Sequence, residues 1–235
     1  MSRKIKIFTD ASSVAEIRKF AGEVWVSGFT TNPTLMRKSG ASDYHEFALA
    51  AIDAAGQLPL SLEVVADDPP SMIREGRIIG SWGSNVNVKI PITTTDGVSC
   101  LPAVKELLDS GIKVNITAIM ADSQVEGLLE ILRYDSDVII SVFAGRIADT
   151  GVDPVPLMTK YAAWIKDYPN AQLLWASPRE VLNLVQAEEC NCHIFTATPE
   201  ILNKIHLLGK DLEEFSRETV QMFYEDARSA NFKIP

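Results

Sequence analysis

A lysine near the end of an apolar segment is the residue of this chain best suited to covalent chemistry. The segment Val86–Pro91 (VNVKIP) alternates β-branched residues, as buried parallel strands do, and proline ends it because proline has no N–H for the sheet. Lys89 therefore lies near a strand tip. Burial disfavours the charged form of an amine, and a neutral amine can attack a ketone to form a Schiff base. Taken alone, the pattern favours a simpler interpretation, in which the ammonium group reaches the surface at the strand end.

The elements that must position this lysine form a regular alternation. Eight apolar strands are predicted at residues 4–10, 24–28, 60–65, 86–91, 113–119, 137–143, 172–176 and 192–196. Helices are predicted at residues 14–22, 34–38, 44–56, from 67–70 onward, and at 100–110, 122–133, 154–167, 177–187, 199–206 and 212–230, with loops at 29–33 and 144–149. Eight strand–helix units predict a parallel (β/α)8 barrel. An open doubly wound sheet is the less favoured alternative, because the first turn lacks the glycine-rich dinucleotide pattern.

No linker or change of composition divides the chain. We therefore expect one domain over residues 1–235, with the barrel over about 1–208 and an additional C-terminal helical tail over about 210–235. In such barrels the active site lies at the C-terminal ends of the strands. Polar side chains fall at or near those predicted ends, and they are Asp10, Thr31, Asn32, Glu63, Lys89, Asn115, Thr117, Ser141, Arg146, Ser177 and Arg179, with Phe143 among them. Independent helix caps and solvated loops would not usually place this set around one lysine.

The composition of the chain limits which partners and which cellular compartment we expect for the protein. The net charge of −9, without basic runs, argues against nucleic acid, and no apolar run is long enough to span a membrane. An anionic substrate would therefore need a local cationic pocket. Three unpaired cysteines fit a reducing cytoplasm, and Cys190, Cys192 and His193 have poor spacing for zinc. Residues 1–4 lead directly into the first strand, so we expect no signal peptide.

Seven motifs, in order along the chain, resemble those of the short, single-domain transaldolases. They are FTDAS (8–12), GFTTNPTL (28–35), SLEV (61–64), VKIP (88–91), VNIT (114–117), SVFAGRIAD (141–149) and ASPR (176–179). Each motif alone is weak, but TTNP, VKIP and GRIAD together are specific. The resemblance implies a (β/α)8 barrel that needs no metal or cofactor. The fructose 6-phosphate aldolases, which share the barrel and the lysine, are the nearest relatives of this family.

The resemblance also implies four catalytic residues. Lys89 matches the Schiff-base lysine, and Asp10 matches the acid/base that takes the C4 hydroxyl proton during C3–C4 cleavage. Glu63 and Thr117 match the pair that holds and activates a water. The related aldolases typically carry glutamine at the position of Glu63, so the glutamate favours transaldolase. The simpler alternatives are a helix cap for Asp10 and a structural ion pair for Glu63.

The remaining matches are expected to bind substrate. Thr31, Asn32, Asn115 and Ser141 are placed to bind sugar hydroxyls, although Asn32 precedes a proline and fits a turn residue, and Asn115 and Ser141 can also satisfy nearby backbone groups. Phe143 stands where the aldolases place tyrosine and cannot donate a proton there; core packing is its alternative role. Arg146, Ser177 and Arg179 form the expected phosphate clamp, with Ser177 at a helix start; solvated surface arginines are the alternative.

The expected activity is transfer of a dihydroxyacetone unit from a ketose phosphate to an aldose phosphate. Two alternatives stay open: a fructose 6-phosphate aldolase-like enzyme that releases free dihydroxyacetone, and a non-catalytic barrel that only binds sugar phosphates. Relatives commonly assemble as decamers of two five-membered rings through the C-terminal helix. Leu212, Phe215, Met222 and Phe223 give this chain a suitable apolar face, which fits equally well packing on its own barrel.

Overall fold

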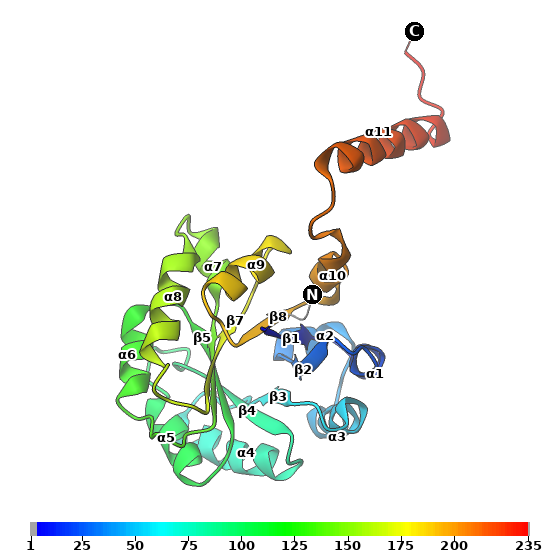
Figure 1. Ribbon diagram of the computed structural model, residues 1–235. Coiled ribbons are helices and arrows are strands. Elements are labelled where there is room, and N and C mark those ends of the chain that lie inside the picture. The colour runs from blue at the N-terminus through cyan, green and yellow to red at the C-terminus, as the bar shows by residue number, and fades with distance from the viewer. Residues whose placement is uncertain (1–3, 235) are drawn as a thin grey trace. The chain divides into compact units, whose positions relative to one another are not determined.

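A closed barrel of eight parallel strands forms the centre of the fold (Figure 1). The structure is a computed structural model and describes residues 4–234, so residues 1–3, on which the expectation of no signal peptide partly rests, lie outside it. Strands pair with their sequence neighbours and β1 closes on β8. The strands are β1 (Lys6–Asp10), β2 (Val26–Thr30), β3 (Leu60–Glu63), β4 (Val86–Pro91), β5 (Val114–Ile119), β6 (Val138–Val142), β7 (Ala171–Trp175) and β8 (Ile194–Ala197). The predicted (β/α)8 barrel is therefore confirmed.

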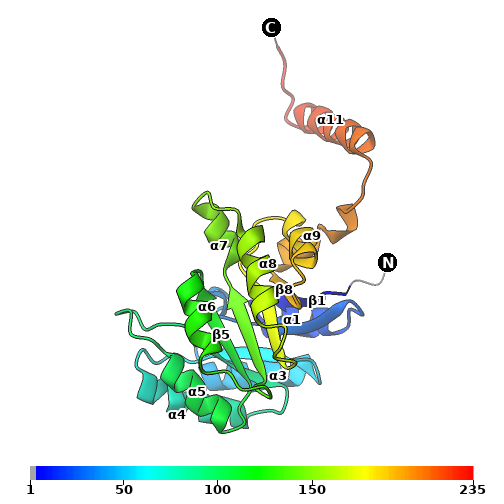
Figure 2. The same cartoon turned by 60° about the vertical axis from the view of Figure 1, so that its left-hand side comes forward.

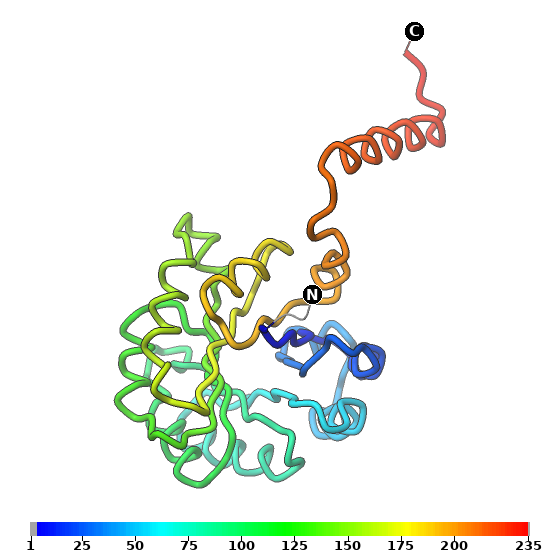
Figure 3. Tube along the Cα trace, viewed as in Figure 1, coloured from blue at the N-terminus to red at the C-terminus, as the bar shows by residue number. Residues whose placement is uncertain are grey.

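Helices follow the strands and lie outside the barrel. The views in Figures 1 and 2 agree that α4, α5, α6 and α8 flank the strand ring, and the Cα trace in Figure 3 can be followed around it from blue to yellow. The helices of the barrel unit are α1 (Val14–Ala21), α2 (Pro33–Lys38), α3 (Tyr44–Ala55), α4 (Pro69–Ser81), α5 (Leu101–Asp109), α6 (Asp122–Leu129), α7 (Ala144–Asp149), α8 (Pro154–Trp164), α9 (Leu182–Glu189) and α10 (Pro199–Leu202). Within residues 4–234 no helix is both long and apolar enough to cross a bilayer.

Three predicted boundaries are wrong in ways that matter for the site. The second strand is shifted by two residues, because Val24 is fully exposed in a turn and the amide of Val26 donates to the Glu23 carbonyl. Residues 144–149, predicted as a loop, form the short helix α7. The helix predicted from residue 177 begins only at Leu182, because Ser177 has a left-handed backbone (φ 59°).

An apolar layer fills the middle of the barrel. Phe8, Ile139, Leu174 and Ile194 form a buried cluster there, with Ala176. Gly28 is needed beside it, since a Cβ at this position would lie 2.5 Å from the ring of Phe8. Polar inward-facing residues lie on both sides of this layer, and those at the C-terminal ends of the strands form the candidate site.

The chain divides into two compact units, Met1–Leu202 and Asn203–Pro235, and each is described by itself. The second contains a 3-10 turn (Ile205–Leu207) and the helix α11 (Leu212–Ser229), so the predicted additional C-terminal helix is present. Asp211 caps α11, because its carboxylate accepts a hydrogen bond from the amide of Glu214 at 2.9 Å.

Candidate active site

A cavity of about 520 Å³ lies at the C-terminal ends of the strands and gathers most of the predicted site residues. Its lining includes ten of them: Asp10, Asn32, Glu63, Lys89, Thr117, Ser141, Phe143, Arg146, Ser177 and Arg179. Thr31 and Asn115 do not line it, and both are fully buried behind the cavity wall. Among the described residues, no three His, Cys, Asp or Glu side chains gather as a metal site would require.

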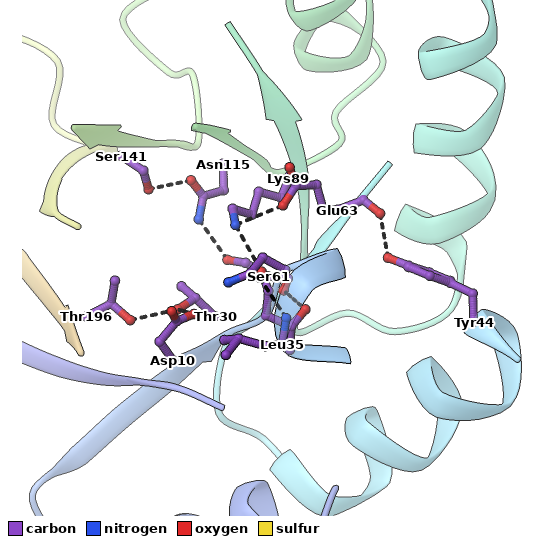
Figure 4. A network of polar contacts seen from close by, with 12 residues as sticks. Asp10, Thr30, Leu35, Tyr44, Ser61, Glu63, Lys89, Asn115, Ser141 and Thr196 are labelled. Carbon is purple, nitrogen blue, oxygen red and sulfur yellow. Dashed lines mark hydrogen bonds and ion pairs between the residues drawn. The ribbon is translucent and has the colours of Figure 1, made fainter. Parts of the chain in front are cut away.

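Lys89 points into the barrel, where two oxygen atoms hold its amine (Figure 4). The Nζ atom lies 2.9 Å from Oε2 of Glu63 and donates to the backbone carbonyl of Thr31, also at 2.9 Å. Glu63 and Lys89 are register partners on β3 and β4, which places the carboxylate and the amine at the same level. Only 6% of Lys89 is exposed, so the amine is enclosed, and the surface interpretation of this lysine is excluded.

Asp10 ends β1 and lies in the same charged cluster. The Thr30 hydroxyl donates to Oδ1 of Asp10 at 2.9 Å. Burial raises the pKa of Asp10 above its ordinary value, while the charge of Lys89 and the Thr30 hydrogen bond partly offset this rise. Asp10 is not the helix cap, since the side chain of Ser13 caps α1. A carboxyl group with a raised pKa in a cavity is suited to exchange protons with a bound substrate.

Two threonines behind Asp10 were not anticipated from the sequence. Thr30 and Thr196 lie 2.7 Å apart between their hydroxyl oxygens, and both line the cavity. Because the Thr30 proton goes to Asp10, Thr196 must be the donor in this pair. The resulting chain of hydrogen bonds fixes the carboxylate orientation. The sequence held one indication of their position: side chains alternate between the two faces of a strand, so both threonines face inward once β2 and β8 are placed correctly.

A β-bulge shapes the wall that carries Thr117. The register between β5 and β6 shifts between Ile116 and Ile119, and Ala118 has a left-handed φ of 62°. A left-handed alanine costs about 1 kcal/mol or more, so the surrounding structure must hold it. The Thr117 hydroxyl is buried without a hydrogen-bond partner in the described part of the chain. A buried hydroxyl in this state is a ready acceptor or donor for a bound water.

A buried network supports the wall between β3 and β6. Ser141 donates to Oδ1 of Asn115 at 2.6 Å, and Nδ2 of Asn115 donates to Ser61 at 2.9 Å (Figure 4). Ser141 reaches the cavity, whereas Asn115 serves as the link between the two serines. The side chain of Thr31 also supports this wall, since its hydroxyl donates to the backbone carbonyl of Ser61. Ser61 was not anticipated, although it lies two residues before Glu63 and so faces the same side.

The entrance of the cavity carries its cationic groups. Arg146 lies on α7 with its guanidinium carbon 5.0 Å from the centre of the Phe143 ring, in cation–π range. Arg179 is paired with Asp149, with Nε 3.0 Å from Oδ1. Lys38, at the end of α2, also lines the cavity and was not anticipated from the sequence.

Ser177 lines the cavity, but a helix does not begin there as predicted. The amides of Arg179 and Glu180 donate to the side chain of Asn183, so they are not free for an anion. The loop also approaches α7 closely: a Cβ at Gly145 would lie 1.7 Å from the Ser177 carbonyl oxygen. The glycine of α7 is thus required by backbone contact between this helix and the loop that carries Ser177.

Asn32 precedes Pro33 at the start of α2 and also lines the cavity. Its Oδ1 accepts from the amide of Leu35 at 3.0 Å and caps α2, while the residue lines the cavity. Its Nδ2 group has no partner among residues 4–234 and remains available for a ligand.

Tyr44, from α3, supports the strand that carries Glu63. Its hydroxyl donates to the backbone carbonyl of Glu63 at 2.5 Å, and burial raises the pKa of Tyr44 so that the phenol stays protonated.

Comparison with known proteins gives consistent matches over almost the whole chain. The family model for "Transaldolase/Fructose-6-phosphate aldolase" matches residues 7–234. A "Probable transaldolase 2" of Listeria monocytogenes is 34% identical over 218 residues, covering 91% of this chain and 95% of that protein. A "Probable transaldolase" of Nitrosopumilus maritimus is 34% identical over 220 residues, covering 91% and 94%.

Solved structures with the same architecture have little sequence in common with this chain. A dihydrodipicolinate synthase from Rhodopseudomonas palustris matches with a TM-score of 0.57 at 12% identity, covering 96% of this chain and 82% of that one. A 2,3-dimethylmalate lyase matches with a TM-score of 0.59 at 9% identity, covering 97% and 84%. At such identities the likeness extends to the fold alone.

Proposed function

Because the chain belongs to the transaldolase/fructose-6-phosphate aldolase family, we propose that it is a transaldolase that works through a Schiff base on Lys89. The reaction transfers a dihydroxyacetone unit from sedoheptulose 7-phosphate or fructose 6-phosphate to glyceraldehyde 3-phosphate or erythrose 4-phosphate. This is chemistry of the non-oxidative pentose phosphate pathway. The single observation that carries the proposal is the enclosed Lys89 amine, held 2.9 Å from the Glu63 carboxylate at the end of a barrel strand.

The first step is formation of the imine. Glu63 takes a proton from the Lys89 ammonium group, to which it is already hydrogen-bonded, and the neutral amine attacks C2 of the ketose. The resulting carbinolamine loses its hydroxyl as water and becomes an iminium ion. A water held between Glu63 and Thr117 carries protons to and from this centre, which would give the buried Thr117 hydroxyl a partner.

Asp10 drives the second step, cleavage of the C3–C4 bond. Its carboxylate takes the proton of the C4 hydroxyl, C4 becomes an aldehyde, and the bonding electrons move through C3 and C2 to the iminium nitrogen. The phosphorylated aldehyde leaves and an enamine stays on Lys89. A raised pKa makes Asp10 a stronger base once ionised, while the hydrogen bond from Thr30 keeps its carboxylate oriented toward the cavity.

Some residues orient the substrate by contact with it, and others hold those residues in place. Ser141 and the free Nδ2 of Asn32 are available to sugar hydroxyls, while Asn115 and Thr31 act behind them by fixing Ser141 and the Lys89 amine. This assignment moves Asn115 and Thr31 from contact residues to positioning residues.

The substrate phosphate binds at the entrance, where Arg146, Arg179, Lys38 and Ser177 line the cavity. Arginine guanidinium groups bind phosphate through paired, charge-assisted hydrogen bonds. Arg179 must exchange Asp149 for the phosphate or share its guanidinium between them, whereas Arg146 forms no ion pair among residues 4–234, although its charge helps to lower the pKa of the nearby Asp149. Arg146 is therefore the principal phosphate ligand in this proposal.

Two features favour transfer over release of free dihydroxyacetone. Glu63 stands where the related aldolases typically carry glutamine, and Phe143 stands where they place tyrosine and has no proton to donate to the enamine. An aldolase-like enzyme and a silent sugar-phosphate-binding barrel are the alternatives that the test must separate.

The test incubates the enzyme with fructose 6-phosphate, with and without erythrose 4-phosphate. A transaldolase forms sedoheptulose 7-phosphate only when the acceptor is present. Release of free dihydroxyacetone at a similar rate without acceptor would identify an aldolase. Absence of turnover under both conditions, with binding retained, would identify a silent barrel. The Lys89→Met variant is the matched control and is expected to show neither product.

We also propose that the protein works in the cytoplasm as a homo-oligomer, with sugar phosphates rather than nucleic acids or membranes as partners. Three buried, unpaired cysteines support a reducing compartment. The apolar residues of α11, such as Phe215, Met222 and Phe223, support assembly of the decameric kind. Light scattering of the full chain tests the oligomer, and a monomer at micromolar concentration would reject it.

A further inference from the structure

A second cavity, of about 510 Å³, lies at the opposite end of the barrel, at the N-terminal ends of the strands. It shares no lining residue with the candidate active site. Phe8 and Ile139 line its inner wall and belong to the central apolar cluster, so that layer separates the two cavities. The proposed transaldolase chemistry makes no use of this cavity.

One polar residue of this cavity is almost wholly buried. Asn87 lies on β4, two residues before Lys89, and is only 6% exposed. Its side chain lines the cavity and has no hydrogen-bond partner among residues 4–234. Its neighbour Asn85 differs, because Nδ2 of Asn85 donates to the carbonyls of Gly56 and Leu58. An amide enclosed by a barrel without a protein partner is a group that a ligand can satisfy, since it both donates and accepts.

Two lysines line the same cavity and have no carboxylate partner in the described part of the chain. Nζ of Lys6 donates to Oε1 of Gln172 at 3.2 Å, and Nζ of Lys113 donates to the Ser84 carbonyl at 3.2 Å. Lys6 is on β1 and Lys113 immediately precedes β5, which are four strands apart in the closed ring of eight. The two lysines, both exposed, therefore project from opposite sides of the ring of strands.

One carboxylate also lines the cavity. Asp137 immediately precedes β6, next to β5, and has no cationic partner among residues 4–234. It would repel a ligand that is negative throughout, but it accepts a hydrogen bond from a hydroxyl group. The pattern is thus two separated cations, one free amide, and one acceptor carboxylate.

We propose that this cavity binds a small hydroxylated dicarboxylate, with one carboxylate on Lys6 and the other on Lys113. The ligand hydroxyl donates to Asp137, and Asn87 donates its amide protons to the carboxylate that lies deeper in the cavity. The separation of the two lysines selects for a negative charge at each end of the ligand, and two cations beside a single carboxylate make this cavity a local exception to the acidic net charge of the protein.

The test is calorimetric titration of the full-length protein with L-malate in a phosphate-free buffer. We expect one malate per chain, with butyrate, which has one carboxylate and no hydroxyl, not binding measurably. Lys6→Met and Lys113→Met should each weaken malate binding about tenfold, the order of magnitude of one lost charge-assisted hydrogen bond. Asn87→Leu should also weaken it, and the two lysine variants keep the inference testable if this interior change prevents folding.

The matched control is Arg146→Ala, which removes a cation from the catalytic cavity and should leave malate binding unchanged. Malate binding that depends on Arg146 but not on Lys6 or Lys113 would place the ligand in the other cavity and overturn the inference. So would the absence of saturable binding at millimolar malate. Because the readout is binding, a chain without transaldolase activity that still binds malate would refute the proposed function and leave this inference intact.

Discussion

The ion pair between Glu63 and Lys89 should be energetically coupled far more strongly than a surface pair. The two charged atoms lie 2.9 Å apart, and the side chains are 17% and 8% exposed. Coulomb's law gives an attraction of about 6 kcal/mol for this separation at an effective dielectric constant of about 20. Desolvation of both charges offsets part of it, and removal of one partner from a buried pair typically costs about 3–5 kcal/mol.

A double-mutant cycle measures this coupling. Glu63→Gln keeps the size and one acceptor but leaves Lys89 without its counter-charge, Lys89→Met removes the amine, and the double variant removes both. We expect a coupling free energy of about 3 kcal/mol from urea unfolding, with the double variant more stable than Glu63→Gln alone because no buried charge is stranded.

The matched control is the exposed pair Arg77–Glu106, whose atoms lie 2.6 Å apart on side chains that are 52% and 48% exposed. The same cycle there, with Arg77→Met and Glu106→Gln, should give less than about 1 kcal/mol. A coupling between Glu63 and Lys89 no larger than that of the control would refute the view that the barrel encloses the pair.

Three further changes test other parts of the site. Asp10→Asn should abolish turnover yet raise stability at pH 7. Burial raises the pKa of folded Asp10, so the folded protein loses stability as pH rises above 3.8 through the folded pKa, and asparagine escapes this loss. The gain should vanish in acid, an exposed Asp53→Asn control should change little, and an Asp10→Asn variant less stable than the parent at pH 7 would contradict the assignment. Gly145→Ala should lower the free energy of unfolding by about 3 kcal/mol, since its Cβ would overlap the Ser177 carbonyl. The control Gly22→Ala, whose Cβ would make only an ordinary contact at 3.6 Å, should be nearly neutral. Equal effects in thermal unfolding would show that α7 and the loop at Ser177 are not in contact. Thr117→Val should slow turnover, because it removes the hydroxyl that holds the relay water beside Glu63; full activity would exclude the hydroxyl from the proton relay.

The barrel and most of the cavity lining could be predicted because they depend on local patterns. Alternating β-branched residues, caps such as Ser13 and Asp68, and strand-ending polar residues are each visible within a few positions of the sequence. Once eight strands are counted, barrel closure brings their C-terminal ends together. Lys89 and Asp10 therefore came together as expected, although they are far apart in the chain.

The parts that could not be predicted depend on contacts between distant segments. The sequence did not reveal that Thr30 and Thr196 would join behind Asp10, because that requires the exact register of β2 and the closure of β1 on β8. The left-handed Ser177, which delays α9 to Leu182, and the short helix α7 arise where two loops touch through Gly145. Nor does any local pattern show that Asn115 would be enclosed behind Ser141.

Borohydride reduction in the presence of fructose 6-phosphate shows whether the enclosed amine at the end of β4 forms a covalent imine with a ketose. Peptide mapping by mass spectrometry should find a three-carbon adduct on Lys89 and on no other lysine, with loss of activity in proportion to modification. An active enzyme in which Lys89 stays unmodified, or in which another lysine carries the adduct, would contradict the account.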